Sequence, residues 1–328
     1  MAGAYGEAEV VPVSPSGEYP DVEAVGSLAK AAIEMRAERE VLDKKHIEDG
    51  SLDKMKAAVG EAVLRNPYVD EQCLLRFLRA DLGDVKKASK RLTACLEWRE
   101  KRKPEIAVCP SCAADPLAHY VHFVGFDKFG RPALYSCFGL GKEHIVEHNI
   151  QHLVVVLEEV IAKMPPGVEN YVWVTDFHGF GMVDCNPKLP LASNEVFGKH
   201  YPERVGTYIF VEAPKIFSGL WKQIRVFVDK RTYRKAQFVE GPKKEKGAKL
   251  RARLAEIFDE ELVDWLMVEM VENRDKKKAK EKHNPELYSY TAESLERALA
   301  SNVHDPRGPR SHLQRLLESA QGKGLTRT

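Results

Sequence analysis

Residues 200–240 have the sequence HYPERVGTYIFVEAPKIFSGLWKQIRVFVDKRTYRKAQFVE, and this stretch decides the fold of the chain. It opens with a proline-containing turn. The short apolar run at residues 208–211 that follows is typical of a strand buried on both faces. Pro214 then stands where a helix can begin, because proline is favoured at the first helical position. A second strand is expected near Lys235.

After Pro214, large apolar residues recur at helical spacing and basic residues lie between them. The apolar set is Ile216, Phe217, Leu220, Trp221, Ile224, Phe227 and Val228, and the basic set is Lys215, Lys222 and Arg225. This pattern predicts a short amphipathic helix between two strands. The helix is either a lid over an apolar ligand pocket or an ordinary surface helix with its apolar face on the core, and the pattern alone favours the second interpretation.

The overall composition is that of an ordinary globular protein. The chain has 328 residues, of which 30% are charged and 44% are hydrophobic, and its formal net charge is +1. This balance offers no whole-chain attraction for nucleic acid, so no nucleic-acid partner is expected. The apolar run at residues 153–157 is far too short to span a bilayer.

The ends of the chain carry no recognisable targeting or lipidation signal. The first twenty residues lack the basic and apolar regions of a signal peptide, and Ala2 replaces the glycine that myristoylation needs. The final residues, LTRT, are not a prenylation box. We therefore expect a cytoplasmic monomer that contacts membranes peripherally and transiently.

The N-terminal third of the chain is expected to be helical. Residues 1–25 are small, acidic and proline-bearing, which predicts disorder, and residues 27–49 predict a charged helical segment. Residues 51–103 predict a compact helical unit, with helices starting near Ser51 and Asp70 and a third after the turn at 81–84. Residues 104–116 form its linker.

Residues 116–240 predict a mixed α/β lobe. Apolar runs at 120–126, 133–138 and 171–175 indicate strands, and residues 142–164 and 189–201 indicate helices. Strands that alternate with helices imply a mainly parallel sheet covered by helices, so the fold class is α/β.

The C-terminal part is expected to be an extension of this lobe. Residues 241–282 predict a helical extension with two amphipathic helices and a basic run at 274–282. The basic run is either a solvated helix end, which is its usual meaning, or a site of attraction to an anionic membrane surface. Residues 283–328 predict a flexible tail with one short helix near residues 313–317.

Two groups of residues have the spacing of potential metal ligands. Cys109 and Cys112 have the spacing of a zinc or redox pair, but a four-thiolate site needs a second pair and a redox dithiol would usually open a helix beside a strand. The cysteines are therefore interpreted as reduced, largely buried thiols. His144, His148 and His152 lie four residues apart, and a polar helix face is the favoured interpretation, so no metal site is predicted.

No constellation for catalysis is visible. The segment 139–142, GLGK, lacks the full phosphate-loop spacing, and there is no Gly-x-Ser-x-Gly elbow. Asp176 and Asp184 have no nucleophile or base beside them in the sequence. The expectation is a binding protein rather than an enzyme, with no catalytic residue and no cofactor.

The order of the motifs resembles that of CRAL-TRIO lipid-binding proteins, the phosphatidylinositol-transfer family. The segment 74–99 resembles the N-terminal helical subdomain of that family. DKFGRPALY (127–135), WVTDFHGF (173–180), YPERVGTYIFVEAPKIF (201–217) and FVDKRTYRKAQF (227–238) resemble successive motifs of its lipid-binding lobe. The resemblance covers residues 51–240. It implies a five- or six-stranded sheet that floors an apolar lipid pocket closed by an amphipathic gate helix, which now favours the lid for the helix after Pro214.

The resemblance also implies site residues. Glu203 and Lys235 match positions that contact the headgroup in members that carry phosphatidylinositol, although the pair could instead be a structural ion pair. The expected headgroup set is Glu203, Lys235 and Tyr171. The expected acyl-pocket and gate set is Phe123, Leu134, Trp173, Phe217, Leu220, Trp221 and Ile224, and the expected membrane contacts are Lys222 and Arg225.

The chain departs from the family pattern at several of these positions. Asp81 and Leu82 replace a basic pair that often supports the headgroup. Phe123, Leu134 and Trp173 replace polar residues used by members that bind phosphatidylcholine, and only Tyr171 keeps a hydroxyl. The expected ligand is therefore phosphatidylinositol, which the protein would transfer or present between membranes. The alternatives are another hydrophobic ligand of tocopherol, retinoid or sterol type, and a lipid-sensing adaptor that transfers nothing.

Overall fold

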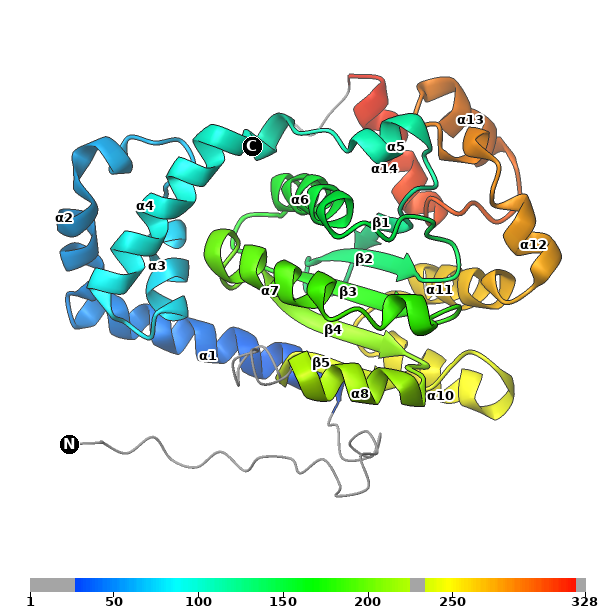
Figure 1. The fold of residues 1–328 in the computed structure, drawn as a ribbon, viewed down its shortest axis with the longest axis horizontal. Helices are drawn as coiled ribbons and strands as arrows, with labels where there is room; N and C mark the ends of the chain where they lie inside the picture. Colours follow the sequence, from blue (N-terminus) through cyan, green and yellow to red (C-terminus); the bar gives the residue numbers. More distant parts are fainter. Residues whose placement is uncertain (1–26, 225–233, 323–328) are drawn as a thin grey trace.

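A computed structural model describes residues 27–224 and 234–322 of the chain. The described residues contain a five-stranded sheet with strand order β1-β2-β3-β4-β5 (Figure 1). Its strands are β1 (Val121–Phe126), β2 (Pro132–Cys137), β3 (Tyr171–Asp176), β4 (Val205–Val211) and β5 (Ala236–Val239). β1 and β2 form an antiparallel hairpin, and the remaining neighbours pair in parallel. The predicted α/β class and the mainly parallel sheet are confirmed.

The helices that connect the parallel strands all lie on one face of the sheet. They are α6 (Val146–Ala162), α7 (Lys188–His200) and α8 (Lys215–Ile224). Since the strands follow one another in one direction and β-α-β crossovers are right-handed, each crossover must return over the same face. The opposite face is then left for α10 (Lys244–Ala255) and α11 (Glu260–Asn273).

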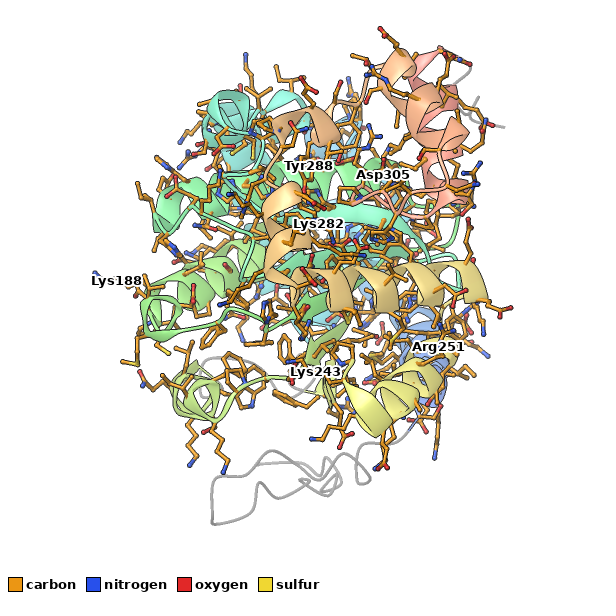
Figure 2. The ribbon with its side chains drawn as sticks, turned by 90° about the vertical axis from the view of Figure 1, so that its right-hand side faces the viewer. Lys188, Lys243, Arg251, Lys282, Tyr288 and Asp305 are labelled. Carbon is orange, nitrogen blue, oxygen red and sulfur yellow. The ribbon has the colours of Figure 1, made fainter. Side chains whose placement is uncertain are left out.

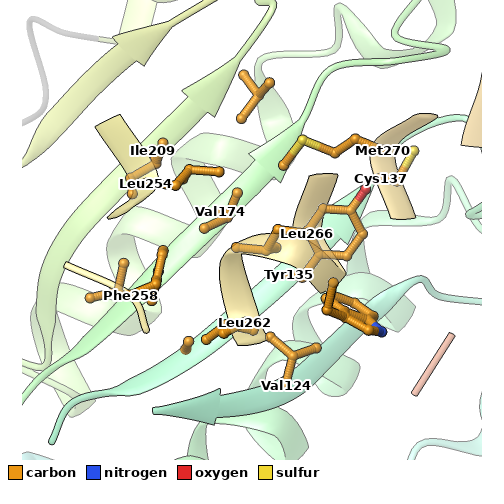
Figure 3. Close-up of a cluster of buried hydrophobic side chains, with 14 of the residues drawn as sticks. Val124, Tyr135, Cys137, Val174, Ile209, Leu254, Phe258, Leu262, Leu266 and Met270 are labelled. Carbon is orange, nitrogen blue, oxygen red and sulfur yellow. The ribbon is translucent and has the colours of Figure 1, made fainter. Parts of the chain in front are cut away.

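The face under α10 and α11 is a closely packed core (Figure 3). Alternate strand residues such as Tyr135, Val174 and Ile209 point toward this face, because the side chains of a strand have a period of two. They pack against Leu254 and Leu266, and all five side chains are completely buried. This core extends along most of the sheet.

The N-terminal helices form a unit of their own beside the sheet (Figure 1). They are α1 (Leu28–Glu48), α2 (Ser51–Leu64), α3 (Glu71–Ala80) and α4 (Val85–Arg102). Asp70 and Asp84 cap α3 and α4 by accepting hydrogen bonds from the backbone amides of Cys73 and Lys87. The apolar stripe of α3 packs against Leu92 of α4 in a separate core, as predicted from its spacing.

Buried ion pairs attach this unit to the lobe. Glu169, which precedes β3, accepts hydrogen bonds from Arg76 at 2.9 Å and from Arg79 at 2.6 Å. At a second place, Arg99 of α4 makes a two-pronged contact with Glu158 of α6 at 2.9 and 2.8 Å. Such charge-assisted contacts fix orientation as well as distance, so the helical unit is held to the sheet at two points.

The segment between α4 and β1 is ordered. It holds the 3-10 turn Pro104–Ile106 and the short helix α5 (Pro110–Ala114). The helix predicted over residues 142–164 begins only at Val146, because the amides of Lys142 and Glu143 donate to the carbonyl of Ala118 and hold this stretch as a loop.

Residues 283–322 differ from the predicted flexible tail. They form a 3-10 turn (Pro285–Tyr288) and helices α13 (Ala292–Ala300) and α14 (Arg310–Ala320), which pack together through buried Leu295, Leu313 and Leu317. His312 of α14 lies against Phe123 of β1, with ring centroids 4.8 Å apart. The apolar positions of these helices are few and are buried by one another and by β1, which is why the sequence pattern was weak.

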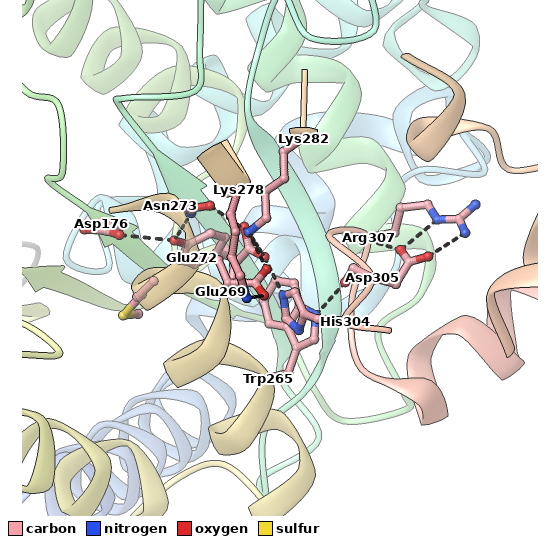
Figure 4. A network of polar contacts seen from close by, with 12 residues as sticks. Asp176, Trp265, Glu269, Glu272, Asn273, Lys278, Lys282, His304, Asp305 and Arg307 are labelled. Carbon is pink, nitrogen blue, oxygen red and sulfur yellow. Dashed lines mark hydrogen bonds and ion pairs between the residues drawn. The ribbon is translucent and has the colours of Figure 1, made fainter. Parts of the chain in front are cut away.

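The basic run differs from a purely solvated helix end. It contains α12 (Lys276–Glu281), whose lysines are exposed, but Lys282 turns inward and is 5% exposed. Its ammonium donates to Glu269 at 2.7 Å and to Asn273 at 2.8 Å, and Glu269 also contacts His304 (Figure 4). Figure 2 shows Lys282, Tyr288 and Asp305 on the side of the molecule where this C-terminal segment covers the end of the sheet.

Residues 1–25, predicted to be disordered, lie outside the described residues. The charged helix predicted over 27–49 corresponds to α1. Among the described residues, no helix combines the length and the apolar character needed to cross a membrane.

Candidate ligand cavity

A cavity of about 530 Å³ lies between the sheet and the helices α6, α7 and α8. This volume is within the range of small-molecule sites in proteins. Aromatic and aliphatic side chains make up most of its lining, and polar and charged side chains from several elements also reach it. The same face of β2, β3 and β4 that is opposite to the packed core forms its floor.

The floor combines aromatic rings with small hydroxyl groups. Trp173 and Thr175 of β3 line the cavity together with Tyr208 of β4 and Ser136 of β2. The indole Nε1 of Trp173 donates to the Ser136 Oγ at 2.9 Å, and that hydroxyl donates to the Thr175 Oγ1 at 3.3 Å. The hydroxyl groups are thus held in a chain along the floor.

Helix α8 covers one end of the cavity with its apolar side. Phe217, Leu220 and Trp221 are at most 9% exposed and all line the cavity. Phe217 packs on Phe177 with ring centroids 4.6 Å apart, and Trp221 packs on Phe238 at 5.7 Å. The helix is therefore seated on a cluster of aromatic rings.

The outer side of α8 faces solvent. Lys222 is exposed, as the amphipathic pattern predicts. The side chain of Ile224 and the whole of Arg225 lie outside the described residues, so their predicted roles stay predictions.

Glu203 and Lys235 meet at another part of the wall. Glu203 lies two residues before β4 and Lys235 directly before β5, and parallel pairing brings these strand starts to the same edge of the sheet. The Lys235 Nζ lies 3.5 Å from the Glu203 Oε2, and both residues line the cavity. Glu203 has a φ of 59°, a left-handed conformation that a non-glycine residue seldom adopts and that often marks a functional turn.

Tyr171, Phe123 and Leu134 are not part of the cavity lining. They belong to a packed cluster under α6, where Leu134 and Tyr171 are completely inaccessible. Burial there raises the pKa of the Tyr171 phenol. The structure therefore does not bring these three side chains to the ligand space, because α6 packs directly on this end of the strands.

Two hydroxyl groups that do reach the cavity, those of Ser136 and Thr175, were missed. Ser136 and Thr175 lie two residues after Leu134 and two after Trp173, on the same face of the sheet. The alternation of side-chain direction along a strand predicts that Ser136 and Thr175 face the same side of the sheet as Leu134 and Trp173. It does not predict where along the strand the covering helix ends.

The three histidines spaced four residues apart have three different environments, so a common polar face is wrong. His144 lies before α6 and close to Asp184, and His148 contacts the Glu143 carboxylate at 2.7 Å, which lowers the pKa of Glu143 to about 2. His152 is 8% exposed and stacks on His119 with ring centroids 4.2 Å apart.

The acidic residues that were considered for catalysis have structural partners. Asp176 accepts two hydrogen bonds from the Arg274 guanidinium at 2.7 Å each and one from the Tyr135 hydroxyl at 3.2 Å. Asp184 accepts from the Gly181 amide at 2.8 Å and so closes a turn. These carboxylates hold the carboxyl ends of the strands and the loop beside them.

Comparison with known proteins agrees with this architecture. Residues 119–263 match the CRAL/TRIO domain, and residues 45–94 match the CRAL/TRIO N-terminal domain. The chain belongs to the CRAL/TRIO family. The helical unit and the lobe described above are its two parts, and the resemblance stated from the sequence motifs is confirmed. CRAL/TRIO domains are lipid-binding domains.

Two relatives illustrate the distance between this CRAL/TRIO protein and characterised ones. It is 31% identical to Patellin-6 of Arabidopsis thaliana over 58% of this chain and 49% of the relative. It is 27% identical to the phosphatidylinositol transfer protein PDR17 of Saccharomyces cerevisiae over 53% of each chain. The chain thus spans about half the length of these curated relatives. The crystal structure of Sfh5 aligns with 64% of this chain and 80% of that chain, with 17% identity and a TM-score of 0.45.

Proposed function

We propose that this CRAL/TRIO protein binds a phospholipid, with phosphatidylinositol as the first candidate, and transfers or presents it between membranes. The observation that carries the proposal is a cavity with two chemically different parts. One part is enclosed by the aromatic cluster under α8, and the other holds the Glu203–Lys235 pair. An amphiphilic ligand has the same division.

The charged pair suits a phosphoinositol headgroup. An ammonium group favours phosphate, and a carboxylate accepts hydrogen bonds from several hydroxyl groups. The Lys235–Glu203 contact of 3.5 Å is long for a charge-assisted hydrogen bond, so a ligand can exchange partners with the pair at small cost. The name of PDR17 as a phosphatidylinositol transfer protein favours the same ligand.

The apolar part suits an acyl chain. β4 has seven residues and spans about 20 Å, which is close to the length of an extended chain of about sixteen carbons. Such a chain gains about 12 kcal/mol on leaving water, at about 0.8 kcal/mol per methylene group. A bilayer already buries the acyl chain, so the cavity has to provide a similar free energy of burial. The activation barrier of lipid exchange then lies in opening the cavity and moving the lipid.

In this proposal α8 is the gate. Its apolar side covers the cavity in solution and would lie against the membrane during exchange, while Lys222 on its outer side meets anionic headgroups. Opening on the bilayer avoids exposing the lipid to water.

A different hydrophobic ligand is the second candidate, and the floor of the cavity favours it. The large rings of Trp173, Tyr208 and Phe210 occupy space on the sheet that two acyl chains would need. A single-chain, isoprenoid or sterol-like molecule with one hydroxyl could place that hydroxyl on Ser136 and Thr175. Such a ligand would not need the charged pair.

The ligand can be identified by native mass spectrometry and lipid extraction of the purified chain, compared with two lysine variants. Lys235→Ala is expected to lower the bound phosphatidylinositol at least tenfold. Lys249→Ala removes an exposed lysine of α10 on the other face of the sheet and should retain the wild-type amount. Equal phosphatidylinositol in both variants would remove Lys235 from the headgroup site, and a sterol-like ligand retained by both would establish the second candidate. An empty wild-type chain that captures a protein partner would favour an adaptor.

The gate is tested by lipid transfer between vesicles that contain phosphatidylinositol. The double variant Leu220→Asp with Trp221→Asp is expected to lower the transfer rate at least tenfold, because the apolar side of α8 can no longer close the cavity or enter the membrane. The matched control is Val268→Asp with Val271→Asp on α11, which adds the same charge at positions that are 42% and 52% exposed. Unchanged transfer by the α8 variant would contradict the gate.

A further inference from the structure

Four potential metal ligands converge at the far end of the cavity. They are Cys109, Cys112, His119 and His152, and their ligand atoms all lie within 4.8 Å of one another. The Cys112 Sγ is 3.3 Å from the Nδ1 of His119 and 3.4 Å from the Nδ1 of His152. The Cys109 Sγ is 3.7 Å from the Nδ1 of His119.

The fold holds these groups in place from three separate segments. Cys109 and Cys112 lie at the start of α5, where Pro110 opens the helix and leaves the two thiols one turn apart. His119 directly precedes Tyr120 and β1, and its neighbour Ala118 is tied to the loop at 142–143 by two backbone hydrogen bonds. His152 projects from the second turn of α6.

The distances fit a tetrahedral ion. With metal–sulfur and metal–nitrogen bonds of about 2.3 and 2.05 Å, a tetrahedral zinc ion places sulfur and nitrogen ligands about 3.6 Å apart. The observed sulfur–nitrogen distances of 3.3, 3.4 and 3.7 Å fall on both sides of this value. Two thiolates with two imidazoles are a ligand set that zinc prefers.

Burial adds a second argument. Cys109, His119 and His152 are 6%, 3% and 8% exposed, and Cys112 is half-buried. The imidazole rings of His119 and His152 stack on each other with an interplanar angle of 8°, so one ring has to turn for both Nδ1 lone pairs to point at one ion. Zinc bound in this way would neutralise two thiolates and satisfy all four ligand atoms.

We propose that Cys109, Cys112, His119 and His152 bind one zinc ion through both sulfurs and both Nδ1 atoms. Four protein ligands leave no open coordination position, so the ion is structural. It ties the 104–116 connector to β1 and α6. Because His119 and His152 also line the cavity, the ion fixes the wall of the ligand space at the end opposite to Glu203 and Lys235.

A second cluster of potential metal ligands among the described residues is not proposed as a metal site. Glu269, Glu272 and His304 lie close together, but the Lys282 ammonium stands between them, 2.7 Å from Glu269 and 3.4 Å from Glu272. A lysine in that position replaces a cation.

Metal content measures the proposal directly. The full chain is expressed in zinc-supplemented medium, purified with a reducing agent and analysed by inductively coupled plasma mass spectrometry. The expected result is one zinc per chain for the wild type and less than about a tenth of that for Cys109→Ser with Cys112→Ser. Cys185→Ser removes a half-buried thiol outside the cluster and should keep the full zinc content.

Cobalt binding by the wild type provides a readout that does not depend on the folding of a variant, and two His152 variants then test the ligand set. Cobalt(II) added to the reduced, zinc-free wild type should produce the intense visible bands of a tetrahedral cobalt–thiolate centre at one equivalent. His152→Cys should retain such bands with a shifted spectrum, and His152→Ala should lose them. A wild-type chain without zinc and without cobalt bands, or one isolated with a Cys109–Cys112 disulfide, would overturn the proposal.

Discussion

The two faces of the sheet are built from the same strands and differ completely in how they are filled. On the α10–α11 side, Val174 and Ile209 are completely buried in a hydrophobic core under these helices. On the α6–α8 side, their neighbours Trp173 and Tyr208 border a cavity of about 530 Å³. Side-chain burial on the α10–α11 face therefore stabilises the fold, whereas side chains around the cavity on the α6–α8 face are packed less completely.

Polar groups follow the same division. On the packed side Asp176 is completely buried and is matched by three donor contacts from Arg274 and Tyr135. On the cavity side the Lys235 ammonium lies 3.5 Å from the Glu203 carboxylate, a longer distance than those between Arg274 and Asp176. Close pairing is required where water cannot enter, and looser pairing is tolerated where a ligand or water can.

The largest effect is expected from breaking the pair on the packed side. Arg274→Met leaves the buried Asp176 carboxylate without its cation, and the free energy of unfolding should fall by about 3–5 kcal/mol. Lys235→Met, measured by the same urea titration on the lipid-free chain, should cost about 1 kcal/mol or less, because Glu203 is partly exposed. Equal losses would mean that the cavity side is as tightly organised as the packed side.

A leucine truncation on each face gives the next largest difference. Leu266→Ala opens a hole in a core where that side chain is completely buried, and should cost about 3 kcal/mol. Leu220→Ala removes the same atoms from a side chain that already borders the cavity, and should cost about 1 kcal/mol. Urea unfolding of the two variants checks this, and a Leu220→Ala loss that equals that of Leu266→Ala would show that the cavity closes in solution.

The last comparison concerns pH and the C-terminal helix that packs against β1. Burial, with smaller contributions from Arg315 and Lys163, lowers the pKa of His312 to about 3. The unfolded chain, whose histidines have a pKa near 6.5, therefore takes up the proton first, so stability is complete above about pH 6.5 and falls as the pH drops toward 3. His312→Phe keeps an aromatic ring against Phe123 and should reduce the slope of unfolding free energy against pH by up to about 1.4 kcal/mol per unit.

The control for this slope is His283→Phe, which replaces an exposed histidine on the same C-terminal segment. Its unfolding free energy should follow the wild-type pH profile between pH 6.5 and 4. A His312→Phe profile parallel to that of the wild type would assign the acid sensitivity to other groups, of which the half-buried His122, whose pKa burial lowers to about 4, is the first.

The sequence predicts several residues that line the cavity, and the residues assigned wrongly share one cause. The apolar side of α8 and the Glu203–Lys235 pair follow from local spacing and from motif order. Tyr171 and Phe123 were assigned to the ligand space because they match ligand-contacting positions of the family that the sequence resembles. Whether a residue on that face meets a ligand or a helix depends on where α6 crosses the strands, and no local pattern contains that position.

The C-terminal segment and the metal-ligand cluster were missed for the same reason. Residues 283–322 carry few apolar positions, which α13 and α14 bury against each other, and α14 also packs on β1, which is far away in the sequence. His152 lies forty residues after Cys112, so its approach to the cysteine pair depends on the packing of α6 beside β1.

Local chemistry along the chain is sufficient for the order of strands and helices, the hand of the crossovers and the amphipathic helix after Pro214. These depend on side-chain period, on turn residues and on the right-handed twist of the backbone, all of which act over a few residues or apply to every chain. Long-range packing decides three other features. These are the packed face under α10 and α11, the cavity on the opposite face, and the proximity of two cysteines to two histidines. The helices cover only part of the sheet. Their positions in the folded protein therefore decide which strand side chains are buried by a helix and which border the cavity.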